Sequence, residues 1–448
     1  MAQQQLSGEN PRYERWRWQI FAITWLAYAG FYLTRKSFSV AKIELAKPAV
    51  MGLSKADMSW MDGANSVAYA LGQFGWGMLG DKAGTRRVII LGMLVSVIAA
   101  MLSGASNTVL FLGALLTVQG LVQASGWAPL AKNIGEFFSQ RERGRVMGWW
   151  CTNYAFGGFI ASSLAALAVR WGGGWRYAFW APALGLLLIW VLFIAFQRNR
   201  PEDAGLPAIE NYHGETETVA APTATPDQEA EGSWTVIAEV LGSPMVWLLA
   251  AVYFLVKPTR YLILYWSPVY VNERLGTGTT ESGILGSMFD LAGPLGTLAG
   301  GYLSDRVFQS RRMPVGILAL VTLAILMITF QYLPLTKMAI AGGFFVAGFL
   351  IYIPDSLISG TAAIDFGTKK GASTASGIVN GCGSIGQIIG VTLPGWVGKL
   401  LGQGHEIWNP IFFGLGLALA LAALLLVPHW HRLPAVNLAA ADKAGARR

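Results

Sequence analysis

The chain has 448 residues, of which 54% are hydrophobic and 13% are charged, and its mean hydropathy is +0.46. This composition excludes a soluble globular protein, because apolar stretches of about 20 residues, long enough to cross a bilayer, recur along the chain. A formal charge of +8 would suggest nucleic-acid binding in a soluble protein, but here the charges follow membrane topology.

Twelve apolar stretches are expected to cross the membrane as helices, which predicts an all-α membrane protein. They cover roughly residues 18–40, 57–79, 87–105, 108–136, 143–168, 174–196, 243–268, 279–303, 312–334, 337–362, 371–400 and 405–430. The first stretch has no short apolar core followed by a small-residue cleavage site. We therefore expect it to be retained rather than removed as a signal peptide.

Arginine and lysine residues concentrate in alternate loops. They are Arg12, Arg15 and Arg17 before the first stretch, then Lys82, Arg86, Arg87, Arg141, Arg143, Arg145, Arg198, Arg200, Arg306, Arg311, Arg312, Lys369, Lys370 and Arg432. Because cytoplasmic loops carry this excess, both termini are expected in the cytoplasm. Lys42, Lys47 and Lys55 in the first outer loop run against the rule.

Residues 197–242 are expected to form a cytoplasmic linker, because the segment is polar and acidic, with many Pro and Thr residues. It divides the chain into an N-terminal half, 1–196, and a C-terminal half with its tail, 243–448, of six stretches each. Two parallel six-helix halves around a central cavity make up the major facilitator fold, in which substrate binds near mid-membrane between the halves.

A loop motif occurs once in each half and supports this division. The first copy contains Gly77, Asp81, Lys82, Gly84, Arg86 and Arg87, and the looser second copy contains Gly301, Asp305, Arg306, Arg311 and Arg312. We interpret Asp81, Arg87 and Asp305 as parts of a latch that holds the cytoplasmic side in one conformation. A direct substrate contact is the alternative.

Arg35 and Arg260 are charged residues within apolar stretches, one in the first stretch of each half, and they repeat at nearly the interval of Asp81 and Asp305. Tyr28, Tyr32 and Arg35 share one helix face. An arginine in hydrocarbon is costly and normally faces a cavity or a partner. Two guanidinium groups, each able to donate two parallel hydrogen bonds, suit a doubly charged phosphate.

One alternative concerns the position of Arg35. Hydropathy alone would allow Arg35 to lie at the outer end of the first stretch, with its side chain extended to water. In the C-terminal half, Tyr253 and Lys257 share the helix face of Arg260, and Pro258 is expected to bend this helix.

Further charges fall within the apolar stretches: Lys36, Lys257, Asp290 and Asp355. Unpaired buried charges are expensive, so we expect Lys36 and Lys257 to pair with Asp290 or Asp355 in ion pairs that break and re-form during transport. Substrate contact by Lys257 or Asp355 is the alternative. The four histidines lie in loops or tails, and no metal or cofactor motif is evident.

Nearly the whole chain resembles the organophosphate:inorganic phosphate antiporter family. The resemblance is carried by YLTRKSF around Arg35, TRYLILYWSP around Arg260, GWAPLAKNIGEFFSQRERG at 126–144, RPEDAGLPAIENY at 200–212 and GFLIYIP at 348–354. It implies that Arg35 and Arg260 are the essential arginines. It also implies that Tyr28, Tyr32, Tyr69 and Tyr352 are the matching tyrosines and Asp290 the matching acid.

The chain departs from this family at three positions. Several members carry a histidine in helix five, where this chain has Asn153, and the acidic residue five after the helix-seven arginine is Tyr265 here. Gln73 replaces a lysine found in some members. Both arginines remain, so these changes bear on the choice of substrate rather than on the phosphate requirement. Asp355 is also unusual for the family.

The expected function is exchange of a phosphorylated metabolite for inorganic phosphate, by a monomeric carrier without cofactor and without enzymatic activity. We expect two uncompensated cations in the empty cavity to hinder its reorientation and so to favour exchange over one-way transport. The alternatives are a membrane sensor for external sugar phosphate, and a proton-coupled organic-anion symporter that uses Asp355 or Asp290 as its proton site.

Overall fold

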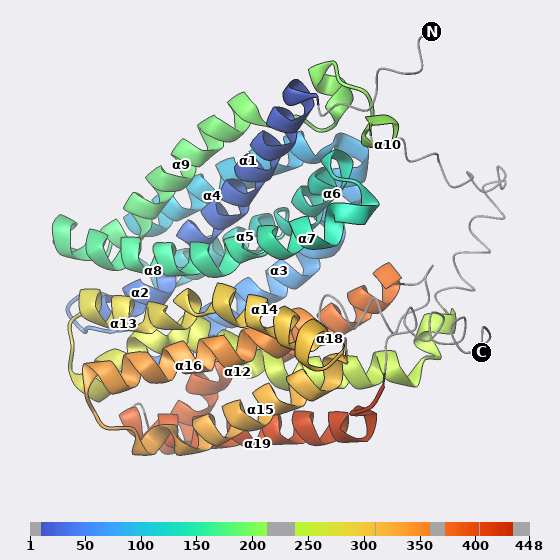
Figure 1. Cartoon of the computed structure of the whole chain (residues 1–448). Helices are drawn as coiled ribbons and strands as arrows, with labels where there is room; N and C mark the ends of the chain where they lie inside the picture. The colour runs from blue at the N-terminus through green and yellow to red at the C-terminus, as the bar shows by residue number, and fades with distance from the viewer. Residues whose placement is uncertain (1–9, 213–237, 310, 359–371, 403, 433–448) are drawn as a thin grey trace, which may run out of the picture. The chain divides into compact units, whose positions relative to one another are not determined.

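The computed structural model describes residues 10–212, 238–309, 311–358, 372–402 and 404–432 (Figure 1). Within these ranges the regular structure is entirely helical. This agrees with the all-α membrane protein predicted from composition, since in lipid each backbone polar group must find its partner within the protein and a helix satisfies most of them internally.

The N-terminal part of the chain begins with long helices and ends with two short ones. They are α1 (Pro11–Arg35), α2 (Ser37–Leu45), α3 (Lys55–Ala83), α4 (Thr85–Ala105), α5 (Val109–Gln123), α6 (Trp127–Phe137), α7 (Gln140–Trp150), α8 (Thr152–Gly172), α9 (Tyr177–Phe196), the 3-10 turn η1 (Pro201–Ala204) and α10 (Ile209–Tyr212).

The C-terminal part also consists of long helices, which are joined by short helical turns. It contains α12 (Pro244–Leu275), α13 (Thr279–Leu291), α14 (Gly293–Tyr302), the π turn η2 (Leu303–Val307), α15 (Arg312–Thr329), η3 (Phe330–Tyr332), α16 (Lys337–Ser356), α18 (Ala372–Leu401), η5 (His405–Ile407), α19 (Trp408–Leu426) and η6 (Val427–His429).

Eight helical segments of the described chain are long and apolar enough to cross a membrane. They are Thr85–Ala105, Val109–Phe137, Arg145–Gly172, Tyr177–Phe196, Pro244–Leu275, Arg312–Tyr332, Lys337–Ser356 and His405–His429. The other four expected stretches coincide with α1–α2, α3, α13–α14 and α18, which are helical but not among the eight. The membrane protein is confirmed, and the number twelve stays a prediction.

Several expected spans consist of two helices in sequence rather than one. The first changes from α1 to α2 at Lys36, whose backbone N–H still donates to the Tyr32 carbonyl. Similar changes fall at Ala124 between α5 and α6, at Cys151 between α7 and α8, and at Ala292 between α13 and α14. Interrupted helices are typical of transporter binding sites, because they free backbone and side-chain groups near mid-membrane.

Close contacts between α12 and α18 depend on glycine. A Cβ atom at Gly386 or Gly390 would collide with the backbone of Phe254 or Pro258 in α12. Glycine at these two positions therefore allows the backbones of α12 and α18 to approach closely. Around Gly377 and Gly381 on the same helix, no described atom lies within 4 Å of an added Cβ.

The described residues form two compact units. One contains residues 10–45 and 64–212, and the other contains 46–63 and the residues from 238 onward. The start of α3 therefore packs within the second unit, although the sequence assigned it to the N-terminal half. Lys55 makes an ion pair with Glu273 at 2.8 Å and donates to the Gly404 carbonyl, and the Ser59 hydroxyl accepts from the N–H of Gly395.

These contacts also account for lysines that run against the charge rule of the first outer loop. Lys42 is fully buried, with its ammonium group 5.2 Å from the centre of the Phe38 ring. Lys55 is almost fully buried in its ion pair. Both lysine side chains thus have partners within the protein.

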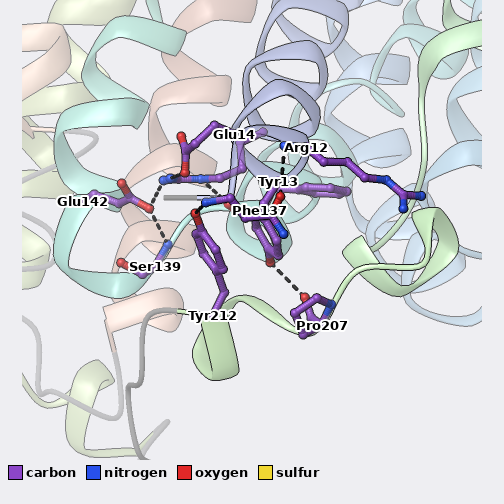
Figure 2. A network of polar contacts seen from close by, with 10 residues as sticks. Arg12, Tyr13, Glu14, Phe137, Ser139, Glu142, Pro207 and Tyr212 are labelled. Atoms are coloured by element: carbon purple, nitrogen blue, oxygen red, sulfur yellow. Dashed lines mark hydrogen bonds and ion pairs between the residues drawn. The ribbon is translucent and has the colours of Figure 1, made fainter. Parts of the chain in front are cut away.

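The beginning of the expected linker packs against the start of α1 (Figure 2). Tyr13 is fully buried, stacks on Tyr212 with ring centres 4.0 Å apart, and donates a hydrogen bond to the Pro207 carbonyl. Arg17 bridges Glu14 and Glu142. Residues up to Tyr212 are thus part of the first unit, and the remainder of the expected linker up to 237 lies outside the described residues.

Candidate functional site

Arg35 is the last residue of α1 and lies inside the first unit, with only 8% of its surface exposed. Its Nε donates to Gln123 Oε1 at 2.9 Å, and its guanidinium lies over the rings of Tyr32 and Tyr69, at 4.6 and 4.8 Å from their centres. These four residues are here called the Arg35 cluster. The helix continues beyond Arg35 as the buried α2. The alternative of an arginine that extends to water at a helix end is therefore wrong.

Gln123 holds Arg35 in place from the end of α5. Its amide nitrogen donates to the Thr34 hydroxyl at 3.0 Å while its oxygen accepts from Arg35. Gln123 was not among the predicted site residues, because a single glutamine in an apolar stretch carries no motif. The signal that could have identified Gln123 is a polar side chain within an apolar stretch, because such a group is costly to bury without a partner.

Tyr28 lies seven residues before Arg35, within a group of aromatic side chains. Its ring centre is 5.9 Å from that of Tyr32, 5.2 Å from that of Trp127 and 5.8 Å from that of Trp150. Three helices contribute to this group, namely α1, α6 and α7. The predicted tyrosines Tyr28, Tyr32 and Tyr69 thus belong to one continuous set of contacts with Arg35.

Asn153, near the start of α8, is fully buried. Neither polar atom of its side chain has a hydrogen-bond partner among the residues that the structure describes. A buried amide without partners costs about 1–3 kcal/mol. Four residues further, Gly157 packs against Ala29 of α1, which places this part of α8 beside the helix that carries Tyr28 and Arg35.

Arg260 and Asp355 form a tight ion pair in the second unit. Arg260 Nη1 lies 3.0 Å from Oδ1 and 2.8 Å from Oδ2 of Asp355, and both residues are at most 5% exposed. The Tyr253 hydroxyl donates to Asp355 Oδ1 at 3.0 Å, and Lys257 Nζ lies 3.9 Å from the same oxygen. These four residues are here called the Asp355 cluster.

The Asp355 cluster answers two earlier expectations. Lys257 does pair with Asp355, as one of the expected combinations. The expectation that both arginines are uncompensated in an empty carrier is wrong for Arg260, because a carboxylate already occupies it. Helix α12 brings Tyr253, Lys257 and Arg260 to one face through consecutive turns, and α16 supplies Asp355.

Tyr352 connects the Asp355 cluster to Asp290. Arg260 lies 4.7 Å from the centre of the Tyr352 ring, and the Tyr352 hydroxyl donates to Asp290 Oδ1 at 3.3 Å. Asp290 is fully buried next to the change from α13 to α14. Tyr352 therefore lies between Asp290 and Arg260 and contacts both.

Lys36, which was expected to pair with Asp290 or Asp355, is 1% exposed in the first unit.

The structure describes only some of the side chains in the two loop motifs that were predicted to form a latch. Asp305 makes a 2.6 Å ion pair with Arg312 within the second copy. Arg87 is exposed at the start of α4. Asp81 lies in α3, but its side chain is outside the part that the structure describes. The latch stays a prediction.

Among the described residues, no group of three or more His, Cys, Asp or Glu side chains is arranged to hold a metal ion. What the two clusters offer chemically is positive charge with hydrogen-bond donors. Buried guanidinium groups next to tyrosine hydroxyls suit a phosphate or carboxylate anion.

Comparisons with known proteins agree with this chemistry. Residues 24–390 match the model of the Major Facilitator Superfamily. The chain is 30% identical over 433 residues to the glycerol-3-phosphate transporter of Bacillus subtilis, covering 95% of both chains. It is 30% identical over 430 residues to the membrane sensor protein UhpC of Escherichia coli, covering 94% of this chain and 93% of the other.

Two further similarities extend this result. A probable hexose phosphate transport protein of Chlamydia trachomatis is 29% identical over 436 residues, covering 94% of this chain and 92% of the other. The crystal structure of a bacterial homolog of the human lysosomal transporter Spinster superimposes with a TM-score of 0.68 at 15% identity. It covers 94% of this chain and 96% of that one, and supports the fold alone.

Proposed function

Since this chain belongs to the organophosphate:inorganic phosphate antiporter family of the Major Facilitator Superfamily, we propose that it exchanges a phosphorylated metabolite for inorganic phosphate by alternating access. The relatives are named as transporters and as a membrane sensor protein rather than as enzymes, so the protein is not an enzyme. We further propose a bacterial inner-membrane location with both termini in the cytoplasm, and a monomeric carrier.

The observation that carries the proposal is the burial of one arginine in each unit. Arg35 and Arg260 are each less than a tenth exposed, and each lies against tyrosine rings. A buried guanidinium is retained in a membrane protein where it meets a partner or a ligand. We propose that each arginine binds the phosphate group from its own unit, so that the bound anion favours the conformation in which both contacts exist.

The organic part of the substrate has its own candidate contacts. Asn153 is buried with both polar atoms lacking partners in the described chain, and the aromatic group around Tyr28 lies on the neighbouring helix. An amide without protein partners is suited to bind a substrate hydroxyl. We propose that Asn153, Tyr28, Tyr32 and Tyr69 contact the substrate in the first unit, and that Lys257 and Tyr352 do so in the second.

A sensor function is the second candidate, and one observation favours it. The similarity to the Escherichia coli membrane sensor protein equals that to the Bacillus subtilis transporter, at 30% identity each. A sensor would keep the arginines and bind the sugar phosphate without carrying it across. Binding without counterflow distinguishes it from a transporter.

The proposal is tested by counterflow in liposomes. Purified protein is reconstituted in vesicles loaded with labelled inorganic phosphate, and glycerol phosphate, hexose phosphates and phosphoglycerate are offered outside one at a time. We expect label to leave the vesicles faster when an accepted phosphoester or phosphate is present outside than when neither is present. Binding of a phosphoester with no release of label would establish the sensor instead, and neither binding nor release would refute both.

A further inference from the structure

Asp355 has an unusual position for an acidic residue in a site that would bind anions. Its carboxylate is 2% exposed and accepts two contacts from Arg260 Nη1, one from the Tyr253 hydroxyl and a longer one from Lys257. A phosphate that binds both terminal nitrogens of Arg260 with two parallel hydrogen bonds needs Nη1 as one of its donors. Asp355 and the phosphate therefore compete for one donor.

The remaining contacts of Asp355 offer it a place when an anion displaces it. Tyr253 lies at 3.0 Å and Lys257 at 3.9 Å, both on α12, about two turns and one turn before Arg260, respectively. A carboxylate released by Arg260 can shorten its contact with Lys257 without leaving the cluster. The cost of displacing it is thus reduced, because a buried charge needs a partner in each state.

We propose that Asp355 is an internal counter-ion that substitutes for the phosphate at Arg260 in the empty carrier. This rests on the proposed exchange function, and it means that transport does not depend completely on a substrate on the opposite side of the membrane. Because Asp355 compensates Arg260 when no substrate is bound, the empty carrier reorients and supports net one-way transport alongside exchange. The same competition weakens phosphate binding relative to a site without the carboxylate.

The experiment compares wild type with Asp355→Asn and Asp355→Glu. Inorganic phosphate binding is measured by calorimetry on detergent-purified protein, and flux is measured in liposomes with and without phosphate outside. For Asp355→Asn we expect phosphate to bind about tenfold more tightly, since an anion no longer competes at Arg260. The ratio of net efflux to exchange is expected to fall by a similar factor, because the empty site now holds an uncompensated cation.

Asp355→Glu is the matched control, because it keeps the charge and changes only the length of the side chain. We expect no gain in phosphate affinity in this variant, because the competing negative charge remains. Structural damage would weaken binding in either variant, so tighter binding in Asp355→Asn alone is a result that a purely structural role does not produce. Equal tightening in both variants would show that charge is not the cause and would overturn the proposal.

Two further results would overturn it. Phosphate affinity in folded Asp355→Asn that equals or falls below wild type would exclude competition at Arg260. Wild-type protein whose efflux is strictly dependent on external phosphate would exclude return of the empty carrier, and this measurement needs no variant. In both cases intact wild-type exchange leaves the proposed function in place, whereas failure of wild type to bind or exchange phosphate would refute that function first.

Discussion

Arg35 and Arg260 are held in place by quite different partners. Arg35 donates to the neutral amide of Gln123, whereas Arg260 donates to the carboxylate of Asp355. Both contacts depend on the planar fork of the guanidinium, whose N–H donors point in fixed directions. A lysine at either position keeps the charge but has neither the fork nor its fixed geometry.

Lysine in place of Arg35 or Arg260 is therefore expected to lower phosphate exchange about 100-fold, the usual effect of a misplaced binding group. The measurement is the rate of phosphate–phosphate exchange in liposomes at equal amounts of inserted protein. Arg15→Lys is the control, because Arg15 is exposed near the start of α1. Exchange near the wild-type rate in either site variant would contradict the proposed role of the arginines.

Among the helices, the packing of α18 against α12 positions the Asp355 cluster. Gly383 lies against Tyr253 and Lys257, and Gly390 lies against the backbone of Pro258. Since α12 also carries Arg260, a change in the spacing of these two helices moves three members of the cluster together. Small residues at helix contacts let backbones approach in this way.

Gly390→Ala is expected to destabilise the protein by about 1–3 kcal/mol, because the added methyl group overfills a close backbone contact. It should also slow exchange by displacing α12. The measurement is thermal unfolding of the purified protein in detergent, combined with the exchange assay. Gly381→Ala on the same helix has open space in the described chain and should unfold at the wild-type temperature. Equal effects of the two variants would be evidence against this contact.

For the molecule as a whole, the driving force distinguishes an antiporter from a proton-coupled symporter. The symporter hypothesis needs Asp355 or Asp290 to gain and lose a proton during transport. Asp355 instead makes an ion pair with Arg260, and Asp290 accepts a hydrogen bond from Tyr352. Both carboxylates therefore already serve as acceptors for neighbouring side chains in the second unit.

Exchange is accordingly expected to continue unchanged when an ionophore collapses the proton gradient, and to stop when internal phosphate is omitted, apart from the net flux that Asp355 permits. The check is uptake of labelled phosphoester into liposomes under both conditions. Uptake that fails with the ionophore but tolerates the absence of internal phosphate would establish proton coupling and refute the antiporter.

The sequence by itself determined the fold class and which residues are candidates for the site. Apolar stretches of bilayer length leave few structures other than helices, and charge in such stretches is costly enough to mark function. The repeat of Arg35 and Arg260 in two halves, together with the motifs around them, was sufficient to suggest the family that the comparisons confirmed.

Only the tertiary structure decided which partner each of these residues meets. Helical periodicity places Tyr253, Lys257 and Arg260 on one face, but Asp355 is 95 residues from Arg260 and comes from another helix. The same holds for Gln123 beside Arg35, for Lys55 beside Glu273, and for the packing of residues 200–212 on α1. Side-chain partners between helices depend on packing distances of a few ångströms, and a one-dimensional pattern carries no information about them.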